Sequence, residues 1–276
     1  AGYVGKHAPD VMRTKDTWFR GIELSYGPDG GVYVLDWSDI GECHDNDGIH
    51  RTSGRIFKIT YGTVKPLSTD LSKDTNKQLS AFTGSSSEWH VRQARRLLHE
   101  RAVDGQDMTS SAKALQSTFR LTTSTPTALR AMWVMNSIGA VDEKWLLQQT
   151  HHQSEHIRTW AIKLLCDRGQ LSSKTKNRFI QMASNDTAGL VQLHLASVLQ
   201  KLPFADRWPL APALASHTTY AKDPVLPLMV WYGLNPAVPE NRTEALKLIT
   251  KCKIPKVRQF IARRLAGEED GPEEKK

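Results

Sequence analysis

The fold of this chain is decided by the stretch Ile157–Leu165, which spells IRTWAIKLL. An aliphatic residue is followed by Arg, two variable residues and a short apolar run, and the same order returns at Val257–Leu265 as VRQFIARRL. Weaker copies lie at Trp89–Leu98, Leu129–Val134, Val191–Leu199 and Val225–Val230. Counted from the aliphatic residue, which is Val91 in the first copy, successive copies begin 28 to 38 residues apart, an interval that holds two helices and two turns. The pattern therefore predicts a repeated helix pair.

A second helix is expected between successive copies. Apolar residues at i, i+3 or i+4 and i+7 give each helix one buried stripe, and Ser, Thr, Asp or Asn near the helix starts supply N-caps, as at Ser124-Thr125-Pro126 and at Ser154. The predicted partner helices are Thr109–Leu121, Asp142–Thr150, Ser173–Ala183, Arg207–Ala215 and Asn241–Cys252. The stripe of large side chains is expected to be core, and its members are Met132, Trp133, Met135, Trp145 and Trp160.

The repeat resembles HEAT-like repeats, whose usual pattern is Val-Arg-x-x-Ala-x-x-x-Leu. That resemblance implies an α-solenoid, a fold that most often serves as a binding surface or a spacer.

Residues 19–60 follow a different pattern. Alternating side chains in Val32–Trp37 and Gly54–Thr60 predict antiparallel strands, and Phe19–Ser25 predicts a third. The sequence GPDGG at 27–31 predicts the hairpin turn between the first two. A sheet this small cannot bury a core of its own. We therefore expect one blade of a larger β array, and we expect the chain to be the C-terminal part of a longer protein.

The expected fold class is thus mostly α: a HEAT-like α-solenoid preceded by a small antiparallel β unit resembling one propeller blade. The predicted organisation is a terminal blade at 1–65, a linker at 66–85, helical repeats at 86–267 and an acidic tail at 268–276.

The loop at 36–50 is crowded with side chains that bind ligands. Asp45-Asn46-Asp47-Gly48 suits calcium, although an EF-type loop requires Asp where Cys43 stands and a Glu downstream. Cys43, His44 and His50 with a carboxylate would suit zinc or another transition metal. The candidate metal ligands are Asp39, Glu42, Cys43, Asp45 and Asp47.

Two further interpretations of the loop stay open. In one, Asp36 and Arg51 bind a carboxylate-bearing cofactor or a sugar, since Arg pairs with carboxylates in bidentate fashion, and His44 or His50 is the catalytic base near neutral pH. In the other, the loop is a hydrogen-bonded turn region in which Asp and Asn cap turns.

A family resemblance bears on this choice. The run DWSDIGECH at 36–44, continued by HRTSGRI at 50–56 and followed by the helical repeats, is similar to the large membrane-bound dehydrogenase-like proteins of planctomycetes and verrucomicrobia. In that family a β-propeller related to soluble quinoprotein sugar dehydrogenases precedes HEAT-like repeats and often a cytochrome c module with a CxxCH haem site.

The resemblance implies a fragment of an extracytoplasmic sugar or alcohol dehydrogenase that uses a PQQ-like quinone and calcium in its full-length form. Its partners would be the missing propeller blades and a cytochrome c module, with the helical repeats as spacer or docking surface. This chain lacks the other blades and any haem motif, so we expect it to be inactive alone. The alternative is a non-catalytic scaffold whose helical repeats bind a protein or a polysaccharide.

Composition narrows the function classes. The formal charge is +8, from 37 Lys or Arg against 29 Asp or Glu. The bases are interpreted as spread over the helical region, which favours a solvated basic surface over nucleic-acid binding. No apolar run approaches the roughly 20 residues that span a bilayer.

The three cysteines, Cys43, Cys166 and Cys252, form no CxxC or CxxCH motif. Cys166 and Cys252 lie on apolar helical stretches and are expected to be buried. The stretch His152–His156, HQSEH, matches the HxxEH pattern of inverted zinc peptidases. It straddles a predicted turn, so the two histidines should not share one helix face, and we expect no peptidase.

Overall fold

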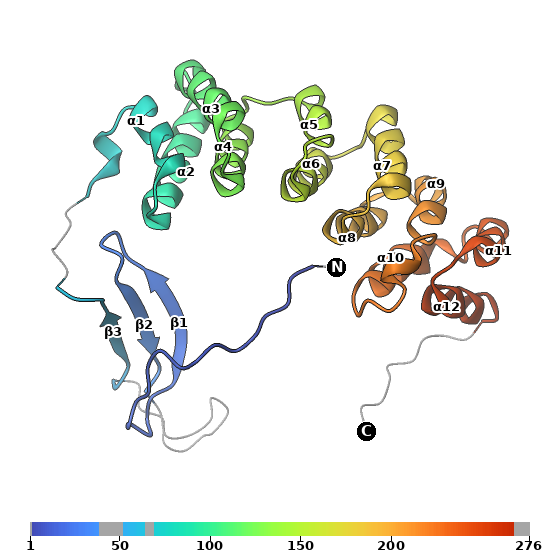
Figure 1. Cartoon of the computed structure of the whole chain (residues 1–276), viewed down its shortest axis with the longest axis horizontal. Coiled ribbons are helices and arrows are strands. Elements are labelled where there is room, and N and C mark those ends of the chain that lie inside the picture. The colour runs from blue at the N-terminus through green and yellow to red at the C-terminus, as the bar shows by residue number, and fades with distance from the viewer. Residues whose placement is uncertain (1, 39–51, 64–68, 268–276) are drawn as a thin grey trace. The chain divides into compact units, whose positions relative to one another are not determined.

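The protein is described by a computed structural model that covers residues 2–38, 52–63 and 69–267. It divides into two compact units, which are Gly5–Thr122 with Pro126–Ala140, and Ala1–Val4 with Thr123–Thr125 and Val141–Lys276. Helices dominate both units, and the described strands form one small antiparallel sheet (Figure 1). The predicted fold class is confirmed.

The sheet is a meander of three strands in the order β1-β2-β3. Its strands are β1 Gly21–Tyr26, β2 Val32–Asp36 and β3 Arg55–Ile59. All three lie within two residues of the predicted strand ends. The hairpin between β1 and β2 closes through the Gly27 N–H, which donates to the Gly31 carbonyl at 2.8 Å, and Gly30 takes φ +81°, a conformation that glycine adopts without strain.

The helices before residue 141 form one group. They are α1 Asn76–Ala81, α2 Glu88–Val103, α3 Thr109–Leu121 and α4 Thr125–Ser137. Helix α1 packs against α2 and α3, and the Arg130 guanidinium of α4 forms an ion pair with Glu88 of α2. The buried side chains include Leu98, Leu115, Met132 and Met135, none of which is exposed to solvent.

The segment predicted as a linker, 66–85, differs from that expectation. Its described part contains α1 and two short 3-10 helices, η1 Leu71–Lys73 and η2 Phe82–Gly84. Thr75 and Gln78 form a capping box at the start of α1. Leu79 is completely buried, so this part of the chain belongs to the helical core.

The helices after residue 141 form four consecutive antiparallel pairs. They are α5 Glu143–Gln149, α6 Glu155–Asp167, α7 Ser173–Asn185, α8 Gly189–Val198, α9 Phe204–Leu214, α10 Leu226–Leu234, α11 Arg242–Lys251 and α12 Pro255–Leu265. Short 3-10 helices adjoin some of them: η3 Leu199–Lys201, η4 Thr218–Tyr220 and η5 Asn235–Ala237.

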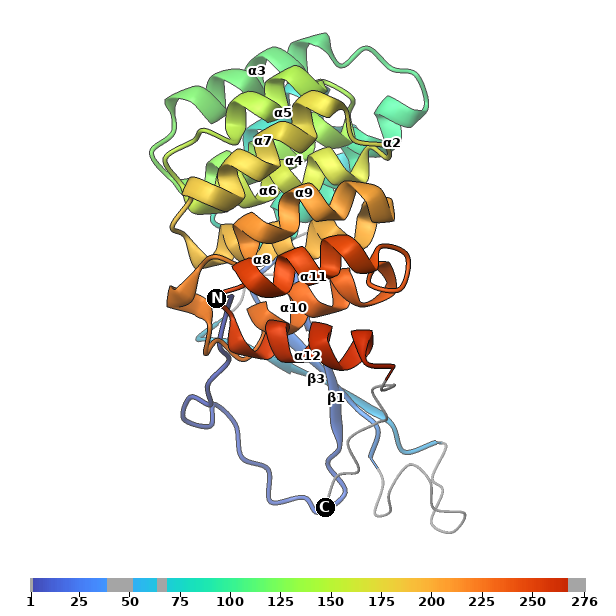
Figure 2. The same ribbon diagram turned by 90° about the vertical axis from the view of Figure 1, so that its right-hand side faces the viewer.

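These pairs stack into two layers. The even-numbered helices α6, α8, α10 and α12 contact one another in sequence order, and α7, α9 and α11 do the same in the second layer (Figure 2). Every helix that the repeat pattern predicted in this range is present, with ends shifted by a few residues. The two-layer stack is the α-solenoid architecture expected of such a repeat.

The apolar stripe of each helix faces the other layer. Ile157, Ala161, Phe179, Val191 and Leu195 are at most 1% exposed. Side chains cap several helix starts: Asp142, Ser172 and Asn241 each accept a hydrogen bond from the third residue of the following helix. None of the described helices is long and apolar enough to cross a membrane.

Two expectations about core residues are resolved. Cys166 and Cys252 are buried, and burial raises the pKa of the Cys166 thiol to about 11. Met132 and Met135 are core residues as predicted, but Trp133, Trp145 and Trp160 are only partly buried. Cations lie over two of those rings, Arg95 over Trp133 and Lys163 over Trp160.

Candidate functional site

Asp36 ends β2 and faces Arg55 of β3 across the sheet. Its carboxylate is completely buried. Oδ1 accepts hydrogen bonds from the backbone N–H groups of Arg20 at 2.7 Å and Ser38 at 3.0 Å, and Oδ2 lies 2.7 Å from Arg55 Nε and 2.6 Å from Arg55 Nη2. An ionised carboxylate offers about four acceptor positions, and three hydrogen bonds, from the backbone N–H groups of Arg20 and Ser38 and from Arg55 Nε, use most of them. The Asp36 carboxylate therefore holds the end of the sheet, and its role in cofactor binding stays a prediction.

Arg55 joins Asp36 to a second carboxylate. Its Nη1 lies 2.5 Å from Oδ2 of Asp16, and the Trp18 backbone N–H donates to Asp16 as well. Burial by itself would raise the pKa of Asp36, but the donated hydrogen bonds and the Arg55 charge leave that pKa below its usual value. Hydrogen bonds from Trp18 and Arg55 lower the pKa of Asp16. Both groups are held as carboxylates at neutral pH, which suits a structural cluster and not a proton-transfer site.

The chain leaves β2 through a strained residue. Ser38 has φ 52°, a left-handed value that non-glycine residues rarely adopt. It is buried, its N–H donates to Asp36, and its carbonyl accepts from the Ser53 hydroxyl at 2.9 Å. The loop is therefore anchored at both of its described ends.

The other predicted site residues lie outside the described residues. They are Asp39, Glu42, Cys43, His44, Asp45, Asp47, His50 and Arg51. Their assignment to a quinone, calcium or transition-metal site stays a prediction. Within 2–38, 52–63 and 69–267, no group of three His, Cys, Asp or Glu side chains is arranged to hold a metal ion.

The HxxEH stretch is split as expected. Helix α5 ends at Gln149 and α6 begins at Glu155, so His152 lies in the turn and His156 on the helix. The Nδ1 atom of His152 accepts from the Ser154 backbone N–H at 3.0 Å, and burial lowers the pKa of His152. These contacts give the two histidines different surroundings, and the peptidase interpretation has no geometric support.

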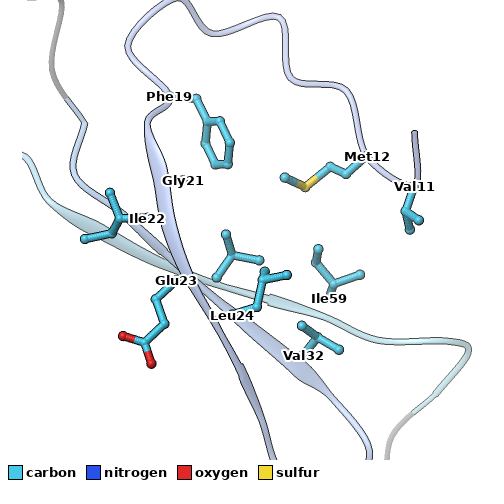
Figure 3. A pocket seen from close by; sticks show the side chains of 10 residues that line it. Val11, Met12, Phe19, Gly21, Ile22, Glu23, Leu24, Val32 and Ile59 are labelled. Atoms are coloured by element: carbon cyan, nitrogen blue, oxygen red, sulfur yellow. The ribbon is translucent and has the colours of Figure 1, made fainter. Parts of the chain in front are cut away.

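One face of the sheet borders an apolar hollow of about 810 Å³. Figure 3 shows Met12 and Phe19 directed toward the same space as Leu24 and Ile59. Glu23 is the single charged residue among the ten that line it. The hollow is therefore suited to an apolar occupant.

The opposite face of the sheet carries both apolar and polar side chains. Strand register places Leu24, Val34 and Phe57 on one face and Leu35 with Ile56 on the other. Ile56 is 71% exposed and Leu24 69%. By the same register Glu23, Ser25 and Lys58 share the second face with Leu35 and Ile56. Apolar side chains therefore occur on both faces, and the face that borders the hollow is the more apolar of the two.

In the helical unit after residue 141, several arginines hydrogen-bond to carbonyl groups of the turns. Arg158 pairs with Asp186 at 2.7 Å and donates to the carbonyls of His152 and Gln153. Arg178 donates to the Thr150 carbonyl, and Arg207 donates to the carbonyls of Leu202 and Gly233. These side chains satisfy carbonyls that helices leave free at their ends, and they are not available to bind a polyanion.

The even-numbered helices carry a distinct outer surface. On α6, His156, Trp160 and Lys163 are not buried and recur at helical spacing, opposite the buried stripe. We define the even-helix face by six such side chains, which are His156, Trp160, Lys163, His194, Tyr232 and Phe260. Tyr232 is 53% exposed, and Lys256 lies over the Phe260 ring. The face combines aromatic rings with cations.

A polypeptide segment of this chain already lies on that face. The Tyr3 ring stacks on the His156 ring, with centroids 6.3 Å apart and planes 10° apart, and the Tyr3 hydroxyl is 3.0 Å from His156 Nδ1. Gly2 is so close to Leu193 of α8 that an added Cβ would lie 3.2 Å from its Cδ2. The pattern analysis had no signal for this contact, since it joins residues 153 positions apart.

The basic side chains are spread over the helical region, but the net charge is not. Residues 241–267 hold eight Lys or Arg and one acid, Glu244, so +7 of the chain's +8 lies in this stretch. The repeat pattern divides this stretch between two helices, so its combined charge is not apparent from either helix alone. The charge is concentrated on α11, α12 and the link between them.

A scan against protein-family models, a search of curated proteins and a search of solved structures each gave no match to this chain.

Proposed function

We propose that this chain is a non-catalytic interaction scaffold that binds a polypeptide on the even-helix face of α6, α8, α10 and α12. The observation that supports it most directly is Tyr3 stacked on His156, with the Gly2 backbone against Leu193. An extended segment with an aromatic side chain already fits this surface.

The chemistry of the face supports the same proposal. Aromatic side chains contribute large contact area, and Trp, Tyr and Arg dominate the energetics of protein interfaces. Lys163 and Lys256 lie over aromatic rings of the face. None of the six side chains that define the face is acidic. Asp167, at the end of α6, is already paired with Lys163 and Lys201.

The test is affinity capture from the source cell's extract with three forms of the full chain. These are the wild type, His156→Ala/Tyr232→Ala on the even-helix face, and Leu246→Ala, a control at a 57% exposed position of α11. The proposal expects a protein that the wild type and the control retain and the double variant loses. Equal retention by all three forms, with unchanged melting temperatures, would contradict it.

A second candidate is that the chain belongs to a quinoprotein-type dehydrogenase located outside the cytoplasm. The observation that favours it is the three-stranded meander with apolar side chains on both faces, since a propeller blade packs against a neighbour on each side. Asp36 already binds Arg20, Ser38 and Arg55, so His44, His50 and Arg51 are the candidate quinone contacts that a binding assay tests first.

This candidate is tested by titrating the chain with pyrroloquinoline quinone, with and without calcium, and following quinone absorbance. Saturable binding that His44→Ala and Arg51→Ala abolish, and that His151→Ala preserves, is the expected result. Absence of saturable binding in both conditions would remove quinone binding from the functions of this chain.

A further inference from the structure

The stretch 241–267 carries a high density of exposed positive charge. Its exposed basic side chains are Arg242, Lys247, Lys251, Lys253, Lys256, Arg258 and Arg263. Lys247 pairs with Glu244 at 2.7 Å, and Arg242 donates to the Leu265 carbonyl at 2.6 Å. Among the residues that the structure describes, the other five form no ion pair with a carboxylate.

Helix stability explains part of this charge. Arg263 and Arg264 lie in the last turn of α12, where the helix dipole favours cations. Lys256 lies in the first turn, where the dipole disfavours a cation, and that turn contains no acid. The Nε atom of Arg264 is buried and has no hydrogen-bond partner within the described ranges. A carboxylate bound near the first turn of α12 would offset the unfavourable interaction of Lys256 with the helix dipole.

Geometry places two of the cations on one side of α12. Lys256, Phe260 and Arg263 are spaced i, i+4 and i+7, so they lie along one face, with Lys256 and Arg263 about 10 Å apart by helical rise. Phe260 packs against Trp231 at 5.4 Å and is half-buried. An extended peptide advances about 3.3 Å per residue, so carboxylates three residues apart would reach both cations.

We propose that this basic surface of α11 and α12 is a docking site for an acidic polypeptide segment. The proposal rests on the proposed scaffold function and names the chemistry of its partner. Charge complementarity is the basis: a surface with five cations that pair with no carboxylate in the described part of the chain attracts a segment that presents several carboxylates.

A peptide is favoured over a single-stranded nucleic acid because α11 and α12 carry few aromatic side chains. Single-stranded nucleic acids stack their bases on exposed aromatic rings. In α11 and α12, both fully described, Phe260 is the single aromatic residue, and its ring is shared with Trp231 and Lys256. This surface therefore offers charge without a stacking platform.

The test is fluorescence anisotropy with a fluorescein-labelled decaglutamate peptide and the full chain at about 50 mM salt, where screening of exposed charges is modest. Two variants change the net charge by the same amount. Lys256→Glu/Arg263→Glu reverses the proposed site, and Lys174→Glu/Lys222→Glu reverses exposed lysines elsewhere. Circular dichroism melts check that both remain folded, and Lys256→Gln/Arg263→Gln provides a milder form of the first.

The proposal expects saturable binding that the first variant weakens about tenfold or more and the control weakens at most about twofold, because attraction becomes repulsion only at the site. Equal weakening by both would assign the binding to net charge and overturn the proposal. Absence of binding would overturn it while leaving the capture result at the even-helix face intact. Tighter binding of a DNA duplex than of the peptide, with the same dependence on Lys256 and Arg263, would overturn the assignment to acidic polypeptides.

Discussion

The helix pairs after residue 141 and the three-stranded sheet bury their apolar side chains to very different degrees. Phe179 in α7 is 1% exposed, whereas Phe57 in β3 is 38% exposed and Ile56 beside it 71%. The helix pairs bury their apolar stripes between two layers of the same unit. The sheet has apolar side chains on both faces and only Val34 as a buried aliphatic residue within its strands.

The difference shows how each region is held together. Burial of apolar surface contributes about 25 cal/mol per Å², and a helix pair that stacks on its neighbours gains this contribution within the chain. The sheet relies instead on hydrogen bonds and on the Asp16–Arg55–Asp36 cluster. The helical unit is therefore expected to fold by itself, and the sheet is expected to gain its full stability when a further apolar surface packs on it.

The largest expected effect is the difference in stability loss between Phe179→Ala and Phe57→Ala. Phe179→Ala should lower the free energy of unfolding by about 3–5 kcal/mol, because it removes a buried ring and leaves a cavity. Phe57→Ala should cost less than about 1 kcal/mol, because its ring is already partly in water. Urea unfolding followed by circular dichroism measures both, and similar losses for the two would refute the comparison.

A smaller effect concerns the arginines that join helix pairs. Arg158→Ala should destabilise the helical unit by about 2–4 kcal/mol, since it leaves Asp186 without its cation and two carbonyls without a donor. Arg258→Ala is the matched control, because Arg258 is exposed on α12, and it should change stability by less than about 0.5 kcal/mol. Thermal melts of both variants check this, and equal melting temperatures would show that Arg158 is dispensable.

The sheet should respond to pH through its carboxylates. Because the pKa of Asp36 in the folded protein is below its unfolded value, the stabilisation is complete above that unfolded pKa of about 3.9. It is lost as the pH falls through the lowered pKa of the folded form. Backbone amide exchange of β2 and β3 should therefore accelerate in acid after correction for intrinsic rates.

Asp36→Asn supplies the comparison for that measurement. The variant should exchange faster at neutral pH and show a smaller additional acceleration in acid, because the group that titrates is gone. Asp10→Asn, which alters an exposed pair with Arg13, should behave as the wild type does. If Asp36→Asn and the wild type exchange alike at neutral pH, the cluster does not hold the sheet.

The smallest effect is expected at the exposed sheet residues. Leu24→Ser/Ile56→Ser should change stability by less than about 0.5 kcal/mol, since both side chains are largely in water. The same variant should bind a hydrophobic dye such as bis-ANS more weakly than the wild type. Val34→Ser, at a buried position of β2, should destabilise the strands more than the double variant does. A larger loss of stability for Leu24→Ser/Ile56→Ser would mean that other parts of this chain cover the two faces of the sheet.

The sequence predicted the helices because their apolar periodicity is a local property. Ile157, Ala161, Leu164 and Leu165 are buried in the way the IRTWAIKLL pattern requires. The short helix α1 was missed, because six residues give too few turns for a periodic signal and its Thr75 capping box lies in a polar stretch.

The candidate site was harder to predict, since its contacts join distant residues. Asp36 stood out in the sequence as a ligand, but its bonds to Arg20 and Arg55 follow from strand pairing, which the loop composition did not specify. The contact between Tyr3 and His156 depends on tertiary structure alone. The basic stretch 241–267, by contrast, could have been found by counting charges along the chain.

The most direct test of the central claim is hydrogen–deuterium exchange of the full chain, followed by mass spectrometry with peptides from both regions. The account predicts that α5–α12 exchange slowly and together, while β1, β2 and β3 exchange much faster, because few buried contacts protect them. Strands that are as protected as Phe179 and its neighbours would contradict the claim that the helix pairs form a self-sufficient fold and the sheet an incomplete one.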